Sequence, residues 1–147
     1  MTLGRGFDRC LTAVTNPHRE TWVALSDEPN DSAARPGLVA AFAILCLEGA
    51  FVGYVQTLAV REDWRNAGLG TALLACMEER IFRDSPNVFI CVSSFNKRAR
   101  ALYERLGYVL VGDLRDFIVS GHDEVLLRKT RGPLSDFNRQ ESRAAPT

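Results

Sequence analysis

The residues whose types and spacing suit them to chemistry lie together between positions 60 and 71 of this 147-residue chain. An apolar stretch that ends at Val60 is followed by Arg65, by the glycines Gly68 and Gly70, and then by residues with the apolar spacing of a helix. Glycines let a backbone turn tightly and approach a ligand closely. The unpaired N–H groups and positive dipole end of the helix that follows attract an anion. The segment therefore predicts a phosphate or pyrophosphate site, to which Arg65 adds a charged contact.

Three kinds of phosphate-binding loop share these features and differ in the residues that follow. A nucleotide P-loop has a lysine directly after its last glycine, where this chain has Thr71. A dinucleotide-binding loop has a third glycine three residues after the second, where this chain has Leu73. The pattern Arg65-x-x-Gly68-x-Gly70 instead resembles the acetyl-CoA pyrophosphate loop of the GNAT superfamily of N-acetyltransferases. Taken alone, the loop is also compatible with a plain helix entry that uses two turn glycines.

A second motif lies downstream and resembles the same family. It reads Asn-x-x-Ala-x-x-Leu-Tyr-x-x-Leu-Gly-Tyr and runs from Asn96 to Tyr108. Asn96 is suited to cap the start of a helix, and Gly107 is suited to follow its end. The resemblance covers about residues 38–131. Two motifs in the right order, at the right separation and on the right types of element are far more specific than either one alone.

Hydrophobic spacing predicts the elements that must position these motifs. The apolar runs Leu38–Leu47 and Ala50–Val60 are separated by a Glu-Gly turn and predict an antiparallel hairpin. Helical spacing follows, with an apolar stripe made of Leu69, Leu73, Cys76 and Ile81, beside Ala72 and Met77. The run Val88–Val92 comes after that helix, so we expect it to lie parallel to the second strand of the hairpin.

The remaining segments complete the predicted fold. Thr21–Leu25 has the composition of a short strand, and Ser26–Gly37 that of a loop. Tyr108–Val119 and Glu124–Lys129 predict a terminal hairpin. We expect residues 1–131 to form one GNAT-like α/β domain, a mixed, mostly antiparallel sheet with a central splayed parallel strand pair flanked by helices. Residues 132–147 are polar and predict a tail.

Composition argues against several classes of partner. Lys+Arg and Asp+Glu both number 18, so no basic field is available for nucleic acid or an anionic membrane. No apolar run approaches the roughly 20 residues of a membrane span, and residues 1–11 lack a signal-peptide apolar region. The four cysteines, Cys10, Cys46, Cys76 and Cys91, are too far apart in sequence for a zinc or redox motif, and no metal is expected. The last three have apolar neighbours and predict buried, reduced thiols in a cytoplasmic protein.

The resemblance implies how the chain would hold acetyl-CoA as co-substrate. The pantetheine arm is expected between the two parallel strands, along the backbone of Leu58, Ala59 and Val60. The pyrophosphate is expected on the loop and helix start formed by Arg65, Asn66, Ala67, Gly68, Leu69, Gly70 and Thr71. Asn96 either bonds the pantetheine or serves only as the helix cap. Arg98, with Lys97 and Arg100, either faces the 3′-phosphate of CoA or belongs to a solvated helix face.

The resemblance also implies the chemistry. An acceptor amine would attack the thioester directly, and Tyr103 would protonate the leaving thiolate, because a phenol of pKa about 10 is still protonated at neutral pH. By spacing alone, a core position is the favoured interpretation of Tyr103, and the motif reverses that preference. The strand Tyr54–Val60 carries no carboxylate or histidine to act as base, which leaves Tyr54 or a chain of waters as a relay. The alternative function is therefore a non-catalytic CoA-binding or CoA-sensing module.

The acceptor cannot be named from these residues, and either a small molecule or a protein amine is compatible with them. The N-terminal part is short for this family, with only Phe7–Val14 available for a further element. We therefore expect the acceptor side to be open or to be completed by a second subunit in a homodimer.

Overall fold

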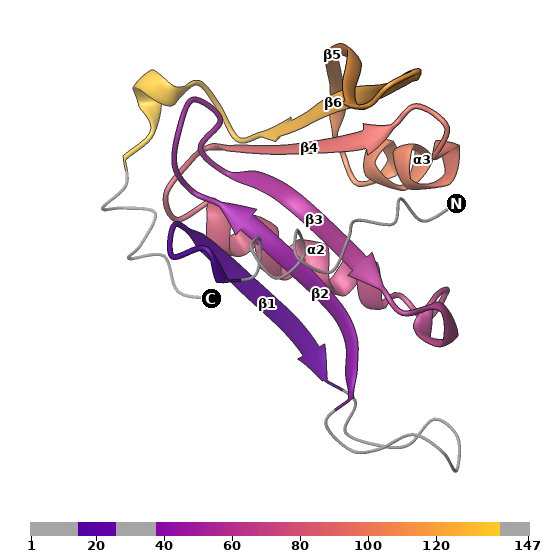
Figure 1. The fold of residues 1–147 in the computed structure, drawn as a ribbon. Coiled ribbons are helices and arrows are strands. Elements are labelled where there is room, and N and C mark those ends of the chain that lie inside the picture. Colours follow the sequence, from indigo (N-terminus) through magenta and orange to yellow (C-terminus); the bar gives the residue numbers. More distant parts are fainter. Residues whose placement is uncertain (1–14, 26–37, 139–147) are drawn as a thin grey trace.

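The structure is a computed structural model that describes residues 15–25 and 38–138 (Figure 1). The strands of these residues form one sheet in the order β1-β2-β3-β4-β6-β5. Their bounds are β1 Arg19–Leu25, β2 Val39–Cys46, β3 Tyr54–Val60, β4 Asn87–Ser93, β5 Val109–Val119 and β6 His122–Thr130. Every neighbouring pair is antiparallel except β3 and β4, which are parallel. The predicted fold class, the first hairpin and the terminal hairpin are confirmed.

Within residues 15–25 and 38–138, helices α2 and α3 and two short 3-10 turns accompany the sheet. Helix α2, Leu69–Ile81, packs on the half of the sheet that contains β2 and β3, and α3, Lys97–Arg105, lies beside the end of β4 (Figure 1). The 3-10 turn η1, Glu62–Trp64, leads from β3 into the glycine loop. The second turn, η2, Leu134–Asp136, lies within the first residues of the predicted tail. In the described part of the chain, no helix is long and apolar enough to cross a membrane.

The phase of the apolar stripe on α2 differs from the prediction. The buried residues are Leu73, Leu74, Met77 and Ile81, whereas Ala72 and Cys76 are exposed. Apolar residues are adjacent in this helix, so the period alone leaves two faces open. The observed face buries the larger side chains and therefore more apolar area. The prediction of a buried thiol is wrong for Cys76, and Cys46 and Cys91 are half-buried.

The ends of α3 are built as the sequence predicts. The Asn96 side chain accepts a hydrogen bond from the Ala99 backbone N–H at 3.2 Å, which caps the first turn. Gly107 follows the helix with φ +92°, a conformation that favours glycine. Tyr103 is the buried residue of this helix, so the helix is anchored through one tyrosine ring.

The parallel ladder between β3 and β4 is short. It consists of the pairs Tyr54–Phe89 and Val55–Ile90, while β4 pairs with β6 along its whole length, from Asn87 to Ser93. The rest of β3 follows β2 instead. The two halves of the sheet therefore diverge beyond these two pairs, and the predicted splayed pair is confirmed.

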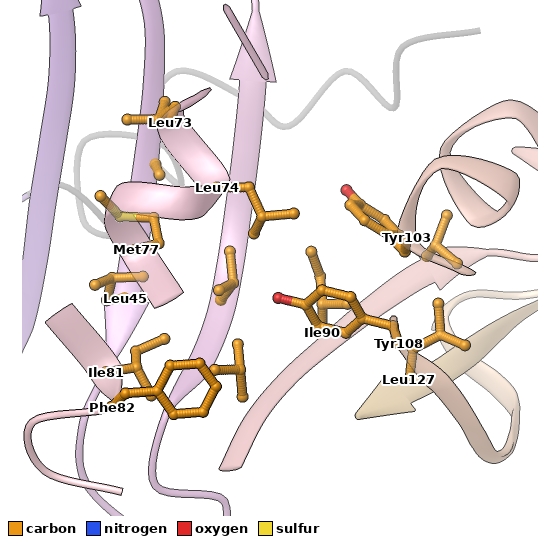
Figure 2. Close-up of a cluster of buried hydrophobic side chains, with 14 of the residues drawn as sticks. Leu45, Leu73, Leu74, Met77, Ile81, Phe82, Ile90, Tyr103, Tyr108 and Leu127 are labelled. Carbon is orange, nitrogen blue, oxygen red and sulfur yellow. The ribbon is translucent and has the colours of Figure 1, made fainter. Parts of the chain in front are cut away.

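One hydrophobic core joins α2, α3 and the helix-facing side of the sheet (Figure 2). Its fully buried side chains are Leu45, Val55, Leu74, Met77, Ile81, Val88 and Leu127. Tyr103 and Tyr108 lie in the same cluster. The predicted Phe7–Val14 element, Cys10 and the Ser26–Gly37 loop lie outside the described residues, as does the tail from residue 139.

Gly53 provides a test of the short ladder. It has φ +91°, and its carbonyl accepts the Phe89 N–H at 2.9 Å where β3 meets β4. A Cβ there would lie 2.3 Å from the Asn87 carbonyl oxygen and 2.5 Å from Ile81 Cγ2. We expect Gly53→Ala to lower the free energy of unfolding in urea by about 1–3 kcal/mol beyond the backbone strain itself. Gly49→Ala is the matched control, because Gly49 has φ +85° with open space around it, and should cost about 1 kcal/mol. Equal losses in the two variants would contradict the close approach.

Candidate active site

The gap between β3 and β4 leaves backbone groups of β3 without a strand partner. The Arg61 N–H donates to the Ala40 carbonyl at 2.9 Å, which fixes the direction of the alternating backbone groups along β3. By this alternation the groups of Ala59 face β2, and those of Leu58 and Val60 face the gap. Leu58 and Val60 are thus placed where the sequence predicts pantetheine contacts, while Ala59 pairs with Phe42.

The glycine loop carries the chain from the end of β3 into α2. Asn66 has φ +65°, and Gly68, with φ +81°, occupies the N-cap position of α2. The Gly68 carbonyl accepts the first helical hydrogen bond, from the Ala72 N–H at 2.9 Å. The backbone N–H groups of the first turn therefore have no partner within the helix, and no side chain caps them. They belong to residues of the predicted pyrophosphate site, Leu69, Gly70 and Thr71.

Two arginines fix the loop in place. Arg65 Nε donates to the Val60 carbonyl at 3.2 Å, so the loop is tied back to the end of β3. Arg98 donates from Nη2 to Asn66 Oδ1, which links the start of α3 to the loop across the gap. Arg65, Asn66, Ala67 and Arg98 are all exposed. The structure thus gathers positive charge around the helix start, although Arg65 also has a structural hydrogen bond that the sequence does not predict.

Gly70 stands where α2 passes the end of β3. A Cβ at this position would lie 3.2 Å from Val60 Cγ2. The helix start and the strand end are therefore in close contact, and the first-turn N–H groups open directly beside the gap.

Tyr103 approaches the gap from α3, and Tyr108 lies next to it. Their ring centroids are 5.8 Å apart, and Figure 2 shows both hydroxyl groups pointing toward the side on which α2 lies. Burial raises the pKa of Tyr103. Burial also raises the pKa of Tyr108, and the nearby Glu78 carboxylate raises it further. Glu78 in turn accepts a hydrogen bond from Lys129 Nζ at 2.6 Å. Both phenols are therefore protonated at neutral pH, and Tyr103 is part of the hydrophobic core.

A second polar cluster lies on the opposite face of the sheet. Along β4, Val88, Ile90 and Val92 join the helix-side core, so Cys91 and Ser93 point to the other face. Ser93 Oγ donates to Glu124 Oε1 at 2.7 Å, and Glu124 is only 4% exposed. Burial raises the pKa of the Cys91 thiol, partly offset by a hydrogen bond with Tyr54, and the Glu124 charge raises it further.

Glu124 was not predicted from the sequence, because a carboxylate was expected on the central strand Tyr54–Val60. Glu124 comes from β6, which the strand order places beside β4. The available signal was the acidic pair Asp123-Glu124 directly before the apolar run Val125–Leu127.

Comparison with known proteins identifies the family to which this chain belongs. The model of the acetyltransferase (GNAT) family matches residues 5–108, which is more than half of the chain. This chain belongs to the GNAT acetyltransferase family. The matched residues include the short parallel ladder, the glycine loop and Tyr103.

Individual relatives agree with the family. Over 77 residues the GNAT chain is 34% identical to an N-alpha-acetyltransferase of Sulfurisphaera tokodaii, covering 51% of this chain and 46% of the relative. It is also 34% identical over 88 residues to an uncharacterized N-acetyltransferase of Methanocaldococcus jannaschii, covering 56% of each. The chain thus spans about half the length of these relatives. Its fold is similar to Arabidopsis thaliana NAA60 in complex with acetyl-CoA, with a TM-score of 0.68, 19% identity and coverage of 86% of this chain and 84% of that one.

The residues beside the gap fit the amide-rich arm of CoA. Gln56 follows the last residue of β3 that pairs with β4, and its side-chain oxygen is buried without a partner in the described part of the chain. A buried acceptor of this kind is costly unless it receives an N–H. The backbone groups of Leu58 and Val60 that face the gap could pair with pantetheine amides.

The buried phenol of Tyr103 should be visible in an alkaline titration. Because folding raises its pKa, its contribution to stability is complete below about pH 10 and is lost as the pH rises further, where the unfolded phenol ionises first. We expect the difference in absorbance at 295 nm between wild type and Tyr103→Phe to appear only as circular dichroism reports unfolding. Tyr108→Phe should give the same pattern. Ionisation of Tyr103 near pH 10 with the folded signal intact would contradict its burial.

Proposed function

We propose that this protein transfers an acetyl group from acetyl-CoA to a primary amine. The observation that carries the proposal is the parallel ladder that ends after two residue pairs, between the start of α2 and Tyr103. This arrangement sets an anion site, unpaired strand groups and a protonated phenol around one gap. Membership of the GNAT family supports the same conclusion.

Binding would use groups already directed toward the gap. The backbone of Leu58 and Val60 would pair with the pantetheine amides as an added strand does. The N–H groups from Ala67 to Thr71 would hold the pyrophosphate at the start of α2. Arg65 and Arg98 would add positive charge beside it. Because the Asn96 side chain already caps α3, its helix role is sufficient to explain that residue.

The chemistry needs one proton donor and one oxyanion site. Acetyl-CoA would supply the acetyl group as a thioester. A backbone N–H of β3 that faces the gap would stabilise the negative charge developing on the acetyl oxygen. Tyr103 would give its proton to the leaving sulfur, and its raised pKa keeps that proton available throughout the neutral range.

We favour the α-amine at the N-terminus of a peptide as the acceptor. The similarity to an N-alpha-acetyltransferase supports this class of substrate. A small-molecule amine is the second candidate, and the exposed glycine loop does not distinguish between them. The expected homodimer and the cytoplasmic location stay predictions.

A non-catalytic CoA-binding module is the alternative function. It is favoured by the composition of β3, which carries no carboxylate or histidine. The two functions separate in one assay, because only the enzyme releases CoA thiol when an amine is added.

Cofactor binding is tested by Gly70→Glu. Glutamate at this position would place bulk against Val60 and negative charge among the first-turn N–H groups. In wild type, acetyl-CoA at a hundred times its Kd should raise Tm by about 5–10 °C. We expect that shift to disappear in Gly70→Glu when measured by thermal unfolding with and without acetyl-CoA.

Gly112→Glu is the matched control, because a side chain at Gly112 on β5 meets nothing within 4 Å. It should keep the full shift with acetyl-CoA. A full shift in Gly70→Glu would exclude the pyrophosphate site proposed here, and no shift in wild type would remove the acetyl-CoA function.

The acid role is tested by Tyr103→Phe, which removes only the hydroxyl group. We expect kcat for thiol release to fall at least about 100-fold, the usual contribution of a general acid, while the Kd for acetyl-CoA changes little. Tyr108→Phe removes the neighbouring hydroxyl group and should leave kcat within a few fold of wild type. Unchanged turnover in Tyr103→Phe would assign the phenol to the core alone.

A further inference from the structure

We propose that Glu124 is the proton acceptor for the substrate amine, reached through the hydroxyl group of Ser93 from the face of the sheet opposite Tyr103. This inference rests on the proposed acetyltransferase function and supplies the base that β3 lacks. Glu124 binds the ammonium form of the acceptor, and the acceptor enters from this face.

The polar cluster of Cys91, Ser93 and Glu124 lies next to the gap. Ile90 is the last residue of β4 that pairs with β3, and Cys91 and Ser93 follow it on the diverging part of the strand. Ser93 pairs with Glu124 in the register of β4 and β6. The carboxylate is therefore one strand away from the gap, and the Ser93 hydroxyl group lies between them.

Glu124 is a buried carboxylate that has no ion-pair partner among the described residues. It is the acidic residue that the described chain buries most completely, with 4% of its surface exposed. Among the described residues, Glu124 accepts a hydrogen bond from the Ser93 hydroxyl group and lies near the Cys91 thiol, which bonds Tyr54. Among the described residues, Glu124 takes part in no ion pair. A buried carboxylate without a cation is costly, and a substrate ammonium group would supply the missing charge.

Tyr103 and the Ser93–Glu124 pair lie on opposite faces of the sheet. Tyr103 belongs to the helix-side core, whereas Ser93 and Glu124 lie on the other face. A thioester held in the gap would be accessible from both faces of the sheet. With an acid beside the sulfur and a base beside the amine, the amine adds to the carbonyl carbon from one face of the sheet. The thiolate is then protonated from the other face.

The protons balance in this arrangement. Ser93 accepts a proton from the ammonium group while passing its own to Glu124. The freed amine nitrogen bonds to the acetyl carbon, the carbon–sulfur bond breaks, and Tyr103 protonates the sulfur. The second amine proton restores Tyr103 through solvent, and Glu124 releases the first. The net products are the amide, free CoA and one proton.

The experiment compares Glu124→Gln with wild type, because glutamine keeps the shape and an acceptor for Ser93 while removing the charge. The probes are acetyl-CoA, a tetrapeptide with a free N-terminal amine and its N-acetylated twin. We expect the thermal shift with acetyl-CoA to be unchanged and kcat with the tetrapeptide to fall about 100-fold. By calorimetry in the presence of CoA, wild type should bind the free amine more tightly than the acetylated twin, and Glu124→Gln should lose that preference.

Two further variants sharpen the test. Ser93→Ala keeps the carboxylate, so it should lower kcat while the preference for the free amine persists. Asp113→Asn removes a charge from the exposed side of neighbouring β5 and should change neither quantity. Equal affinities for the two peptides in wild type, or a preference that persists in Glu124→Gln, would overturn the proposal. An absent acetyl-CoA shift in wild type would instead defeat the proposed function itself.

Discussion

The short parallel ladder between β3 and β4 is the constraint on which the site depends. Each strand has a full antiparallel partner on its outer side, β2 for β3 and β6 for β4. Beyond the Val55–Ile90 pair, β3 follows β2 and β4 follows β6, so β3 and β4 diverge. Unpaired backbone groups within a domain must find another partner or solvent. The gap therefore presents hydrogen-bonding groups at a fixed place, and the glycine loop and the two tyrosines are arranged around it.

Contacts across the gap hold the two halves of the sheet at this separation. At the closed end, Gly53 brings β3 against Asn87. Beside the core, Lys129 of β6 bonds Glu78 of α2, and both side chains are largely removed from solvent. At the open end, Arg98 of α3 bonds Asn66 of the loop. Each contact joins one half to the other, so the width of the gap is set by tertiary structure and not by either half alone.

The two faces of the sheet take different parts of the proposed chemistry. The helix face holds Tyr103 in a packed apolar setting, where burial keeps the phenol protonated. The opposite face holds the buried Glu124, which accepts a hydrogen bond from the Ser93 hydroxyl group and has no ion-pair partner among the described residues. A tyrosine on the apolar stripe of a helix would ordinarily be read as a core residue. Here the core position is also what aims the hydroxyl group toward the gap.

The sequence alone determined the local features. The glycine loop, the Asn96 cap, the Gly107 helix end and both hairpins depend on residues close together in the chain, so spacing was enough to predict them. The parallel strand was predicted from the helix that lies between it and the first hairpin. Tertiary structure decided which face of α2 is buried: the apolar spacing predicted Cys76 on the buried stripe, whereas the helix buries Leu74 and exposes Cys76. It also decided that Glu124 meets Ser93 and that Arg65 bonds Val60. Glu124 and Ser93 are far apart in sequence, and only the order of the strands, which places β6 beside β4, brings the carboxylate next to Ser93.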